Sequence, residues 1–290
     1  MIAQIYVDDI VFGGMSDAMV KHFVSQMQTE FEMSMVGELT YFLGLQIKQM
    51  EESTFLSQRK YAKIIVKKFG MDNASHKRTP EPTHLKLSKD EGGISVDQSL
   101  YRSMIGSLLY LTASILDIAF AVGVCVRYQA EPKVSHLNQV KRIFKYVNGT
   151  SDYGILYTNG SDPVLNGYYD ADWVESADDR KSTSGGCFFL GNNLISWFSE
   201  KQNCVSLSTA EAEYIAAVLS TSPKIQFSIA EPNILISDIT FIRKLVEDKV
   251  ICLEHVTIEL QLADIFTKAF DATQFENLRS KLGICILEES

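Results

Sequence analysis

The sequence is poor in cysteine and has no long hydrophobic run. Its five cysteines are scattered, odd in number, and form neither a CxxC pair nor a zinc-ligand spacing with histidine. We therefore exclude a disulfide scaffold and expect reduced core thiols in an intracellular protein of the cytoplasm or nucleus. Charges at Arg102, Asp117 and Arg127 break the most apolar stretch into runs of 14 and nine uncharged residues. A bilayer span needs about 20 apolar residues, so we expect buried helices and no membrane partner.

An excess of basic residues is also absent. The 290 residues include 36 acidic and 27 basic side chains, which gives a net charge of −9. This balance excludes a protein whose whole surface holds nucleic acid by charge, although it permits a local basic groove. The segment Met1–Asp9 lacks a basic n-region, so we do not expect a signal peptide. The length allows one large domain or two ordinary ones, and no repeat or low-complexity tract is present.

The first half of the chain predicts a β-hairpin followed mostly by helices. Residues 2–14 have the pattern of strand, turn and strand, with Asp8 and Asp9 at the tip. Ser16 offers N-cap chemistry for a helix that runs to about Phe31. Further expected elements are a strand over 40–47, a partner strand around 55–56, a basic helix over 58–69, and helices over 101–112, 118–128 and about 132–148. Between them, 71–98 is rich in Pro, Asn, Ser, Gly and Asp and predicts an extended connection.

The second half changes to short strands after a boundary near 150–162. The expected strands cover 164–169, 186–190, 194–198, 204–207 and 250–256. The expected helices cover 209–219 and 241–248, and a further helix ends the chain. Strands first, and then alternating helices and strands, indicate an α+β or α/β fold with a mixed sheet.

Several acidic residues are candidates for metal binding. Phosphoryl transfer on polynucleotides uses two divalent cations about 4 Å apart, held by carboxylates from separate elements. Magnesium suits such hard oxygen ligands. The candidates are Asp8 and Asp9 at the hairpin tip, Asp170 and Asp172 at the end of a strand, Glu213 on a helix, and Asp264. The alternative for the hairpin is an ordinary Asp-rich turn, and for the others it is a solvated residue or an N-cap.

One stretch of the acidic chain is locally basic. Between Leu56 and Asp90 there are nine Lys or Arg residues and three acids, a local excess of six. Such an excess favours binding to phosphate backbones, which gives affinity without sequence reading. A solvated helix face is the alternative. The candidate binding residues are Arg59, Lys60, Lys63, Lys67 and Lys68 on the helix, while Lys77, Arg78, Lys86 and Lys89 complete the local basic excess.

Ordered motifs along the chain resemble one known family. Tyr6-Val7-Asp8-Asp9, followed by Tyr41-Phe42-Leu43-Gly44-Leu45, looks like the end of the palm of a copia-type LTR-retrotransposon reverse transcriptase. Residues 101–112 and 117–122 are similar to that family's thumb and connection. Its ribonuclease H domain is resembled by Asp170-Ala171-Asp172-Trp173, residues 179–185, Ala210-Glu211-Ala212-Glu213-Tyr214 and residues 261–268. The likeness covers nearly the whole chain and fails only around 219–238.

The resemblance implies roles for individual residues. It makes Asp8 and Asp9 the paired carboxylates of the polymerase metal site, and residues 41–46 the primer grip. It makes Asp170, Glu213 and Asp264 three of the four Mg²⁺ ligands of a ribonuclease H site. It also places the basic helix beside a template–primer duplex or an RNA/DNA hybrid. The implied segments are a palm remnant over 1–50, a thumb and connection over 51–155, and a ribonuclease H-like domain over 156–290, truncated around 219–238.

Two departures from the family pattern lower the expected activity. The family's polymerase uses a further metal-binding Asp on an upstream strand, and only five residues precede Tyr6, so we expect no polymerisation by this chain alone. The family's fourth ribonuclease H ligand lies in a Cys-Asp-Asn segment that the shortened interval lacks. Asp238 is the only Asp between Glu213 and Asp248, and its sequence context does not match that segment. Loss of a bridging carboxylate is expected to cripple two-metal hydrolysis. The alternatives are a non-catalytic remnant that binds nucleic acid or protein, and a pseudogene product.

Overall fold

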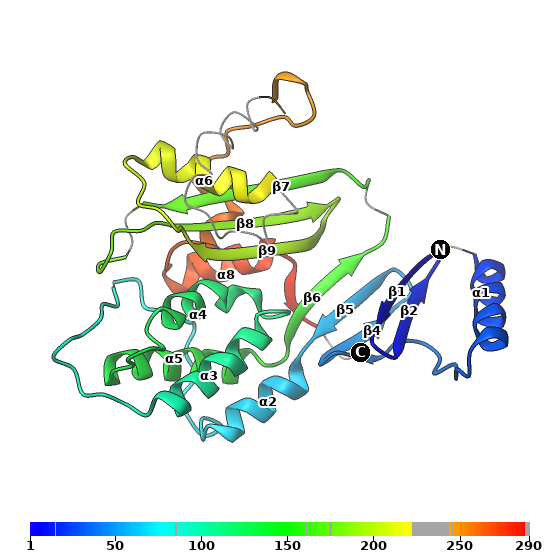
Figure 1. Ribbon diagram of the computed structural model, residues 1–290, viewed down its shortest axis with the longest axis horizontal. Helices are drawn as coiled ribbons and strands as arrows, with labels where there is room; N and C mark the ends of the chain where they lie inside the picture. The colour runs from blue at the N-terminus through cyan, green and yellow to red at the C-terminus, as the bar shows by residue number, and fades with distance from the viewer. Residues whose placement is uncertain are drawn as a thin grey trace.

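The computed structural model describes residues 1–14, 16–84, 86–160, 162–173, 176–221, 244 and 246–287. Within these ranges the chain has an α+β fold with three antiparallel sheets (Figure 1). Its strands are β1 (Ile2–Tyr6), β2 (Asp9–Gly13), β3 (Tyr41–Phe42), β4 (Leu45–Gln49), β5 (Ser53–Ser57), β6 (Tyr153–Thr158), β7 (Leu165–Asp172), β8 (Thr183–Leu190), β9 (Asn193–Lys201) and β10 (Ile284–Ile286). Its α-helices are α1 (Asp17–Glu30), α2 (Arg59–Lys68), α3 (Gln98–Leu111), α4 (Ala119–Val126), α5 (Val134–Thr150), α6 (Thr209–Thr221) and α8 (Ala272–Lys281). The 3₁₀ helices are η1 (Leu116–Ile118), η3 (Ile258–Leu260) and η4 (Leu262–Phe266). No helix in these ranges is long and apolar enough to cross a membrane.

The N-terminal hairpin and α1 form an exposed arm at one end of the molecule (Figure 1). β1 and β2 pair antiparallel, with Tyr6 opposite Asp9, which confirms the predicted strand, turn and strand. The Ser16 hydroxyl caps α1 by accepting a hydrogen bond from the Met19 backbone N–H at 3.5 Å. α1 buries none of its residues. The arm therefore adds little to the hydrophobic core.

The central five-stranded sheet has the order β10-β6-β5-β4-β3. The expected single strand over 40–47 is wrong, because β3 and β4 form a hairpin. Leu43 (φ 48°) and Gly44 (φ 81°) make its two-residue turn, and both have the positive φ that such tight turns require. The sheet also contains β6 and β10, which the sequence did not predict. Its strands come from all three implied segments, so the segment boundaries stay a prediction.

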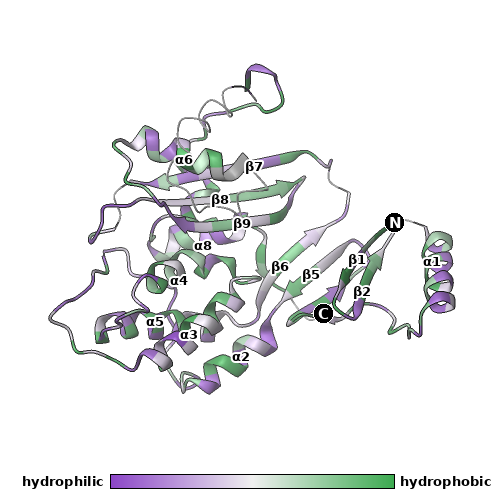
Figure 2. Ribbon diagram, viewed as in Figure 1, coloured by the Kyte–Doolittle hydropathy of each residue, from purple (hydrophilic) through white to green (hydrophobic). Residues whose placement is uncertain are grey.

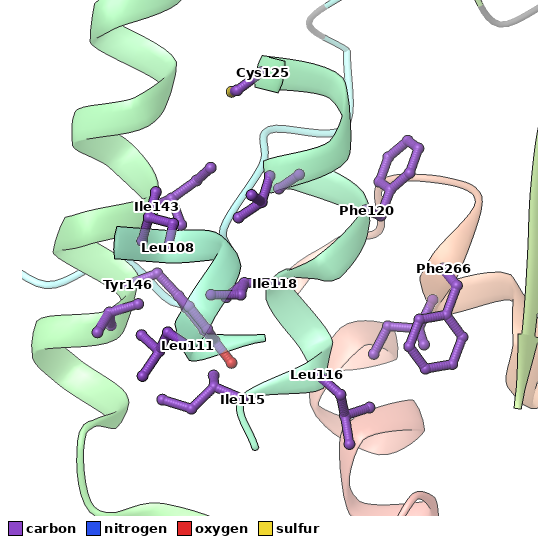
Figure 3. Close-up of a cluster of buried hydrophobic side chains, with 14 of the residues drawn as sticks. Leu108, Leu111, Ile115, Leu116, Ile118, Phe120, Cys125, Ile143, Tyr146 and Phe266 are labelled. Carbon is purple, nitrogen blue, oxygen red and sulfur yellow. The ribbon is translucent and has the colours of Figure 1, made fainter. Parts of the chain in front are cut away.

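Helices α2 to α5 enclose the main hydrophobic core. Figure 3 shows its part between α3, α4 and α5. In α2 the buried residues Ala62, Ile65 and Val66 recur at helical spacing, and the lysines occupy the opposite face. The core extends beyond these helices to Phe266 of η4 and Leu282 after α8. The same cluster includes Cys187 and Phe189 of β8, so one continuous core joins the helical part to the second sheet. Burying side chains of this size contributes about 1.5–3 kcal/mol each. The predicted helices of this half are confirmed to within a few residues at their ends.

The second sheet, β7-β8-β9, carries the acidic candidates of the second half. α6 contacts β7 and β8, while η4 contacts the same two strands and α8 packs on η4 (Figure 1). Gly185 permits the close approach of η4, because a Cβ there would lie 2.7 Å from the Phe266 Cβ. The hydropathy colouring shows the apolar residues of these strands and of α6 (Figure 2). Within the described ranges the sheet is antiparallel rather than mixed.

Two predicted strands of this half are wrong. Residues 204–207 form an irregular connection. The Gln202 side-chain amide joins the two ends of this connection by donating a hydrogen bond to the Ala212 carbonyl at 3.0 Å. Residues 250–256 are also irregular and mostly exposed, so they lack the burial that their apolar pattern suggested. The predicted helix over 241–248 is seen only in part, because 241–243 and 245 lie outside the described residues. Asp238 lies outside them as well.

Candidate functional site

The first acidic candidates stand at the tip of the β1–β2 hairpin. Asp8 lies in the turn and Asp9 begins β2, and both are exposed. Val7 has a φ of 52°, an unfavourable value for a β-branched residue. The Tyr6 ring packs edge-on against Phe42 of β3, with ring centroids 5.9 Å apart. The hairpin therefore contacts β3 next to its tip, and the two exposed carboxylates are adjacent in sequence at a strained turn.

The second group of candidates meets between β7, α6 and η4. Asp170 is the one buried residue of β7, and Asp264 lies in η4 with its side chain only 4% exposed. Glu213 of α6 accepts a hydrogen bond from the Ala171 backbone N–H at 3.3 Å. Thr267 donates its hydroxyl to Asp170. The structure thus brings together three carboxylates that lie far apart in the sequence, and their role as metal ligands stays a prediction.

The carboxylates affect one another's ionisation. Burial, followed by the nearby charge of Asp170, raises the pKa of Glu213 to about 7. The same two causes raise the pKa of Asp264 to about 6, against the opposing effect of Lys268. Burial also raises the pKa of Asp172, two residues along β7. Raised values of this kind show that negative charges are crowded in a partly dry place.

The arrangement does not fit a divalent cation as it stands. In the part of the chain that the structure describes, no three Asp, Glu, His or Cys side chains are placed to hold a metal ion. The ammonium of Lys268 instead lies 2.9 Å from Asp264 Oδ1 and 3.6 Å from Asp170 Oδ2. Sequence reasoning did not single out Lys268, although its spacing of four residues from Asp264 is the spacing of helical ion pairs.

The predicted basic helix is α2, and its cations have different partners. Arg59 and Lys63 both pair with Asp152, at 2.6 and 3.2 Å. Lys60 is exposed and lies 6.0 Å from the centre of the Tyr41 ring. Lys67 and Lys68 are also exposed, and Lys68 donates to the Ser103 hydroxyl at 3.5 Å. All five cations of α2 are exposed, but only Arg59 and Lys63 pair with Asp152 and are partly neutralised by it.

A cleft of about 570 Å³ lies beside this helix. Three tyrosines, Tyr41, Tyr61 and Tyr110, line it together with the β3–β4 turn and small residues of α3. Tyr110 donates its hydroxyl to the Leu43 carbonyl and so joins α3 to the turn. The sequence placed a primer grip at 41–46 only by resemblance, and it gave no signal for the tyrosines of α2 and α3.

Comparisons with known proteins identify the family. Residues 1–83 match the model of the reverse transcriptase (RNA-dependent DNA polymerase) family. The chain is 32% identical over 313 residues to the retrovirus-related Pol polyprotein from transposon RE2 of Arabidopsis thaliana, an alignment covering 97% of this chain and 21% of that protein. It is 38% identical over 226 residues to the Pol polyprotein from transposon TNT 1-94 of Nicotiana tabacum, covering 75% and 17%. It is 36% identical over 222 residues to the uncharacterized mitochondrial protein AtMg00810 of Arabidopsis thaliana, covering 77% and 92%. The chain belongs to the copia-type Pol polyproteins.

The relation to longer proteins of this family is partial. This copia-type chain spans about a fifth of the length of the RE2 polyprotein that it matches. The match to the reverse transcriptase model includes the Asp8-Asp9 hairpin, the β3–β4 turn and α2. No solved structure is a significant match to the chain. The assignment to copia-type Pol proteins therefore rests on sequence similarity.

Proposed function

We propose that this copia-type chain binds the sugar–phosphate backbone of an RNA/DNA hybrid or a template–primer duplex. The observation that carries the proposal is the face formed by α2 and the neighbouring cleft. Lys60, Lys67 and Lys68 face solvent there, next to a cleft of about 570 Å³. A chain with a net charge of −9 that gathers cations on one face has the charge distribution of a local phosphate-binding surface.

The cleft suits a nucleic acid for a second reason. The Tyr41 and Tyr110 side chains are 55% and 45% exposed, so aromatic surface is available beside the lysines. Aromatic faces stack on bases or sugars with little dependence on sequence, while lysines contact the phosphates. The hydroxyls of Ser103 and Ser107 supply neutral hydrogen-bonding groups in the same cleft. Together these groups favour recognition of the backbone over reading of base edges.

Binding of a fluorescently labelled hybrid by the purified chain tests this proposal. Anisotropy titrations at several salt concentrations are expected to show binding at low salt that weakens steeply as salt rises, because phosphate contacts release counterions. An unrelated acidic polymer such as poly-glutamate serves as a competitor control and is expected to compete poorly. Binding that is indifferent to salt, or absent at low salt, contradicts the proposal.

We further propose that the 290 residues alone do not polymerise DNA. The acidic pair of the hairpin is exposed, and among the described residues β1 pairs only with β2. No third carboxylate is placed beside this pair in the described ranges. The test is nucleotide incorporation on a primed template by the purified chain, and incorporation above the level of an Asp8→Asn, Asp9→Asn control refutes the proposal.

Hydrolysis of the RNA strand of a hybrid is the second candidate function. The convergence of Asp170, Glu213 and Asp264 is the observation that favours it. We rank it second because Lys268 already pairs with two of these carboxylates. Magnesium-dependent cleavage that Asp170→Asn abolishes would establish this activity. Binding without cleavage would favour a non-catalytic binding role.

A further inference from the structure

Lys268 is the one cation in direct contact with the acidic cluster among the described residues. It follows η4 directly, four residues after Asp264, and its ammonium is 2.9 Å from Asp264 Oδ1 and 3.6 Å from Asp170 Oδ2. The two carboxylates are 4% and 11% exposed, while the Lys268 side chain is 39% exposed. The Lys268 side chain is therefore partly exposed, while its ammonium contacts two buried carboxylates.

The surroundings hold this arrangement in place. Thr267, the preceding residue, donates its hydroxyl to Asp170, so two consecutive side chains bind carboxylates of the same cluster. Gly185 lets η4 lie directly against β8, and this contact brings the Thr267-Lys268 pair over the end of β7. The position of the ammonium is therefore fixed by the packing of η4 on the sheet as well as by charge.

An ammonium in this position opposes the binding of a divalent cation. A cation shared by Asp170 and Asp264 would need the same oxygen atoms that Lys268 now contacts. It would also be repelled by the positive charge of Lys268, at short range and in a partly dry place where repulsion is poorly screened. For the cation to enter, the lysine has to leave and give up two ion pairs.

We infer that Lys268 is a built-in counter-ion that replaces a divalent cation at the Asp170–Asp264 cluster and keeps metal ions out. The inference does not depend on the proposed binding to a hybrid, since the cluster and the α2 face share no residue. It assigns Lys268 a defined role and explains why the three carboxylates meet without forming a metal site with any other residue that the structure describes.

Direct titration with Mn²⁺ tests the inference in the full chain, without an activity assay. Mn²⁺ binding is followed by electron paramagnetic resonance, and the melting temperature is measured in EDTA, in Mg²⁺ and in Mn²⁺. The variants are Lys268→Met, which keeps the aliphatic stem, and Lys268→Arg, which keeps the charge. Lys201→Met is the matched control, because Lys201 belongs to a separate ion pair with Asp179 at 2.6 Å.

The expected result separates these chains clearly. The wild-type chain, Lys268→Arg and Lys201→Met are expected to bind no Mn²⁺ at the cluster. Lys268→Met is expected to bind Mn²⁺ at least about tenfold more tightly than the lower limit on the dissociation constant that the wild-type titration sets, which corresponds to at least about 1.4 kcal/mol. Its melting temperature is expected to be lowered in EDTA and restored by either cation. Adding Asp170→Asn to Lys268→Met is expected to abolish both effects.

Two results would overturn the inference. The first is Mn²⁺ binding by the wild-type chain that Asp170→Asn abolishes, because the lysine would then fail to exclude the cation. The second is a folded Lys268→Met chain that gains no Mn²⁺ binding, because the lysine would then be no more than a structural partner. If Lys268→Met does not fold, Lys268→Gln replaces it, and the wild-type titration against Asp170→Asn is kept beside it.

Discussion

The salt dependence of hybrid binding gives the sharpest test of the α2 face. The perturbation is the triple change Lys60→Gln, Lys67→Gln and Lys68→Gln, which removes the three cations of this helix that do not pair with Asp152. Each phosphate that a cation neutralises contributes about 0.9 to the slope of log affinity against log salt for B-form DNA. If each lysine contacts one phosphate, we expect the slope to fall by about 2.7.

A matched pair of substitutions on the same helix provides the control. Arg59 and Lys63 are both held by Asp152, at 2.6 and 3.2 Å, so their charges are partly neutralised before any ligand binds. Changing these two residues to Gln is expected to lower the slope by clearly less per residue than the triple change. The fold should not suffer in either case, because all five side chains lie on the exposed side of α2.

The assay is fluorescence anisotropy with a labelled RNA/DNA hybrid over about 50 to 200 mM salt. Circular dichroism of each variant confirms that the helix content is unchanged. Two outcomes refute the reasoning: a slope that the triple change leaves unaltered, and an equal fall per residue in the Arg59 and Lys63 control. The first would remove α2 from the binding surface, and the second would mean that Asp152 does not matter.

Three further predictions concern stability. Tyr146 donates a hydrogen bond to buried Asp117 and accepts one from Arg279 at 3.1 Å, so Tyr146→Phe should lower the free energy of unfolding in urea by about 1–3 kcal/mol. The control is Tyr157→Phe, because the Tyr157 hydroxyl has no hydrogen bond among the described residues and its loss should cost clearly less. Equal losses in the two variants would refute this reasoning. The folded chain raises the pKa of Glu213 from 4.5 to about 7, so it binds the proton of the Glu213 carboxyl more tightly than the unfolded chain does. The free energy of unfolding should therefore fall as pH rises from about 4.5 to about 7. Glu213→Gln should flatten this fall, and a pH profile that the substitution leaves unchanged would show that Glu213 is not its cause. Deletion of residues 1–38 should leave the urea midpoint of the remaining chain nearly unchanged, because no residue of the N-terminal arm belongs to the buried core. A large drop in the midpoint would show that the arm makes stabilising contacts with the rest of the chain.

Local patterns predicted the elements that depend on local physics. The basic helix α2 follows from apolar residues at helical spacing with lysines between them, and α1 follows from the N-cap at Ser16. The β1–β2 hairpin follows from two apolar runs around an acidic turn. Likewise, the strands β7 to β9 and the helix α6 were visible as short apolar segments. These elements were predictable because neighbouring residues determine them.

Features that depend on distant contacts were missed. β10 is three residues long and exists because Ile284 to Ile286 pair with Tyr153 to Ile155, about half the chain away. The Leu43-Gly44 turn was hidden because apolar residues continue through both strands, and only the glycine signals the reversal. Lys268 was missed because its contact with Asp170 depends on how η4 packs on the sheet. The carboxylate cluster itself was predicted by resemblance, and its occupant was not.

The central claim is that this chain binds a hybrid while its acidic cluster, already paired with Lys268, does not cleave it. The most direct measurement follows binding and cleavage of the same end-labelled RNA/DNA hybrid by the purified chain, with Mg²⁺, with Mn²⁺ and with EDTA. We expect salt-sensitive binding in all three conditions and intact RNA throughout. Cleavage that requires Mg²⁺ or Mn²⁺ and disappears in Asp170→Asn would contradict the account.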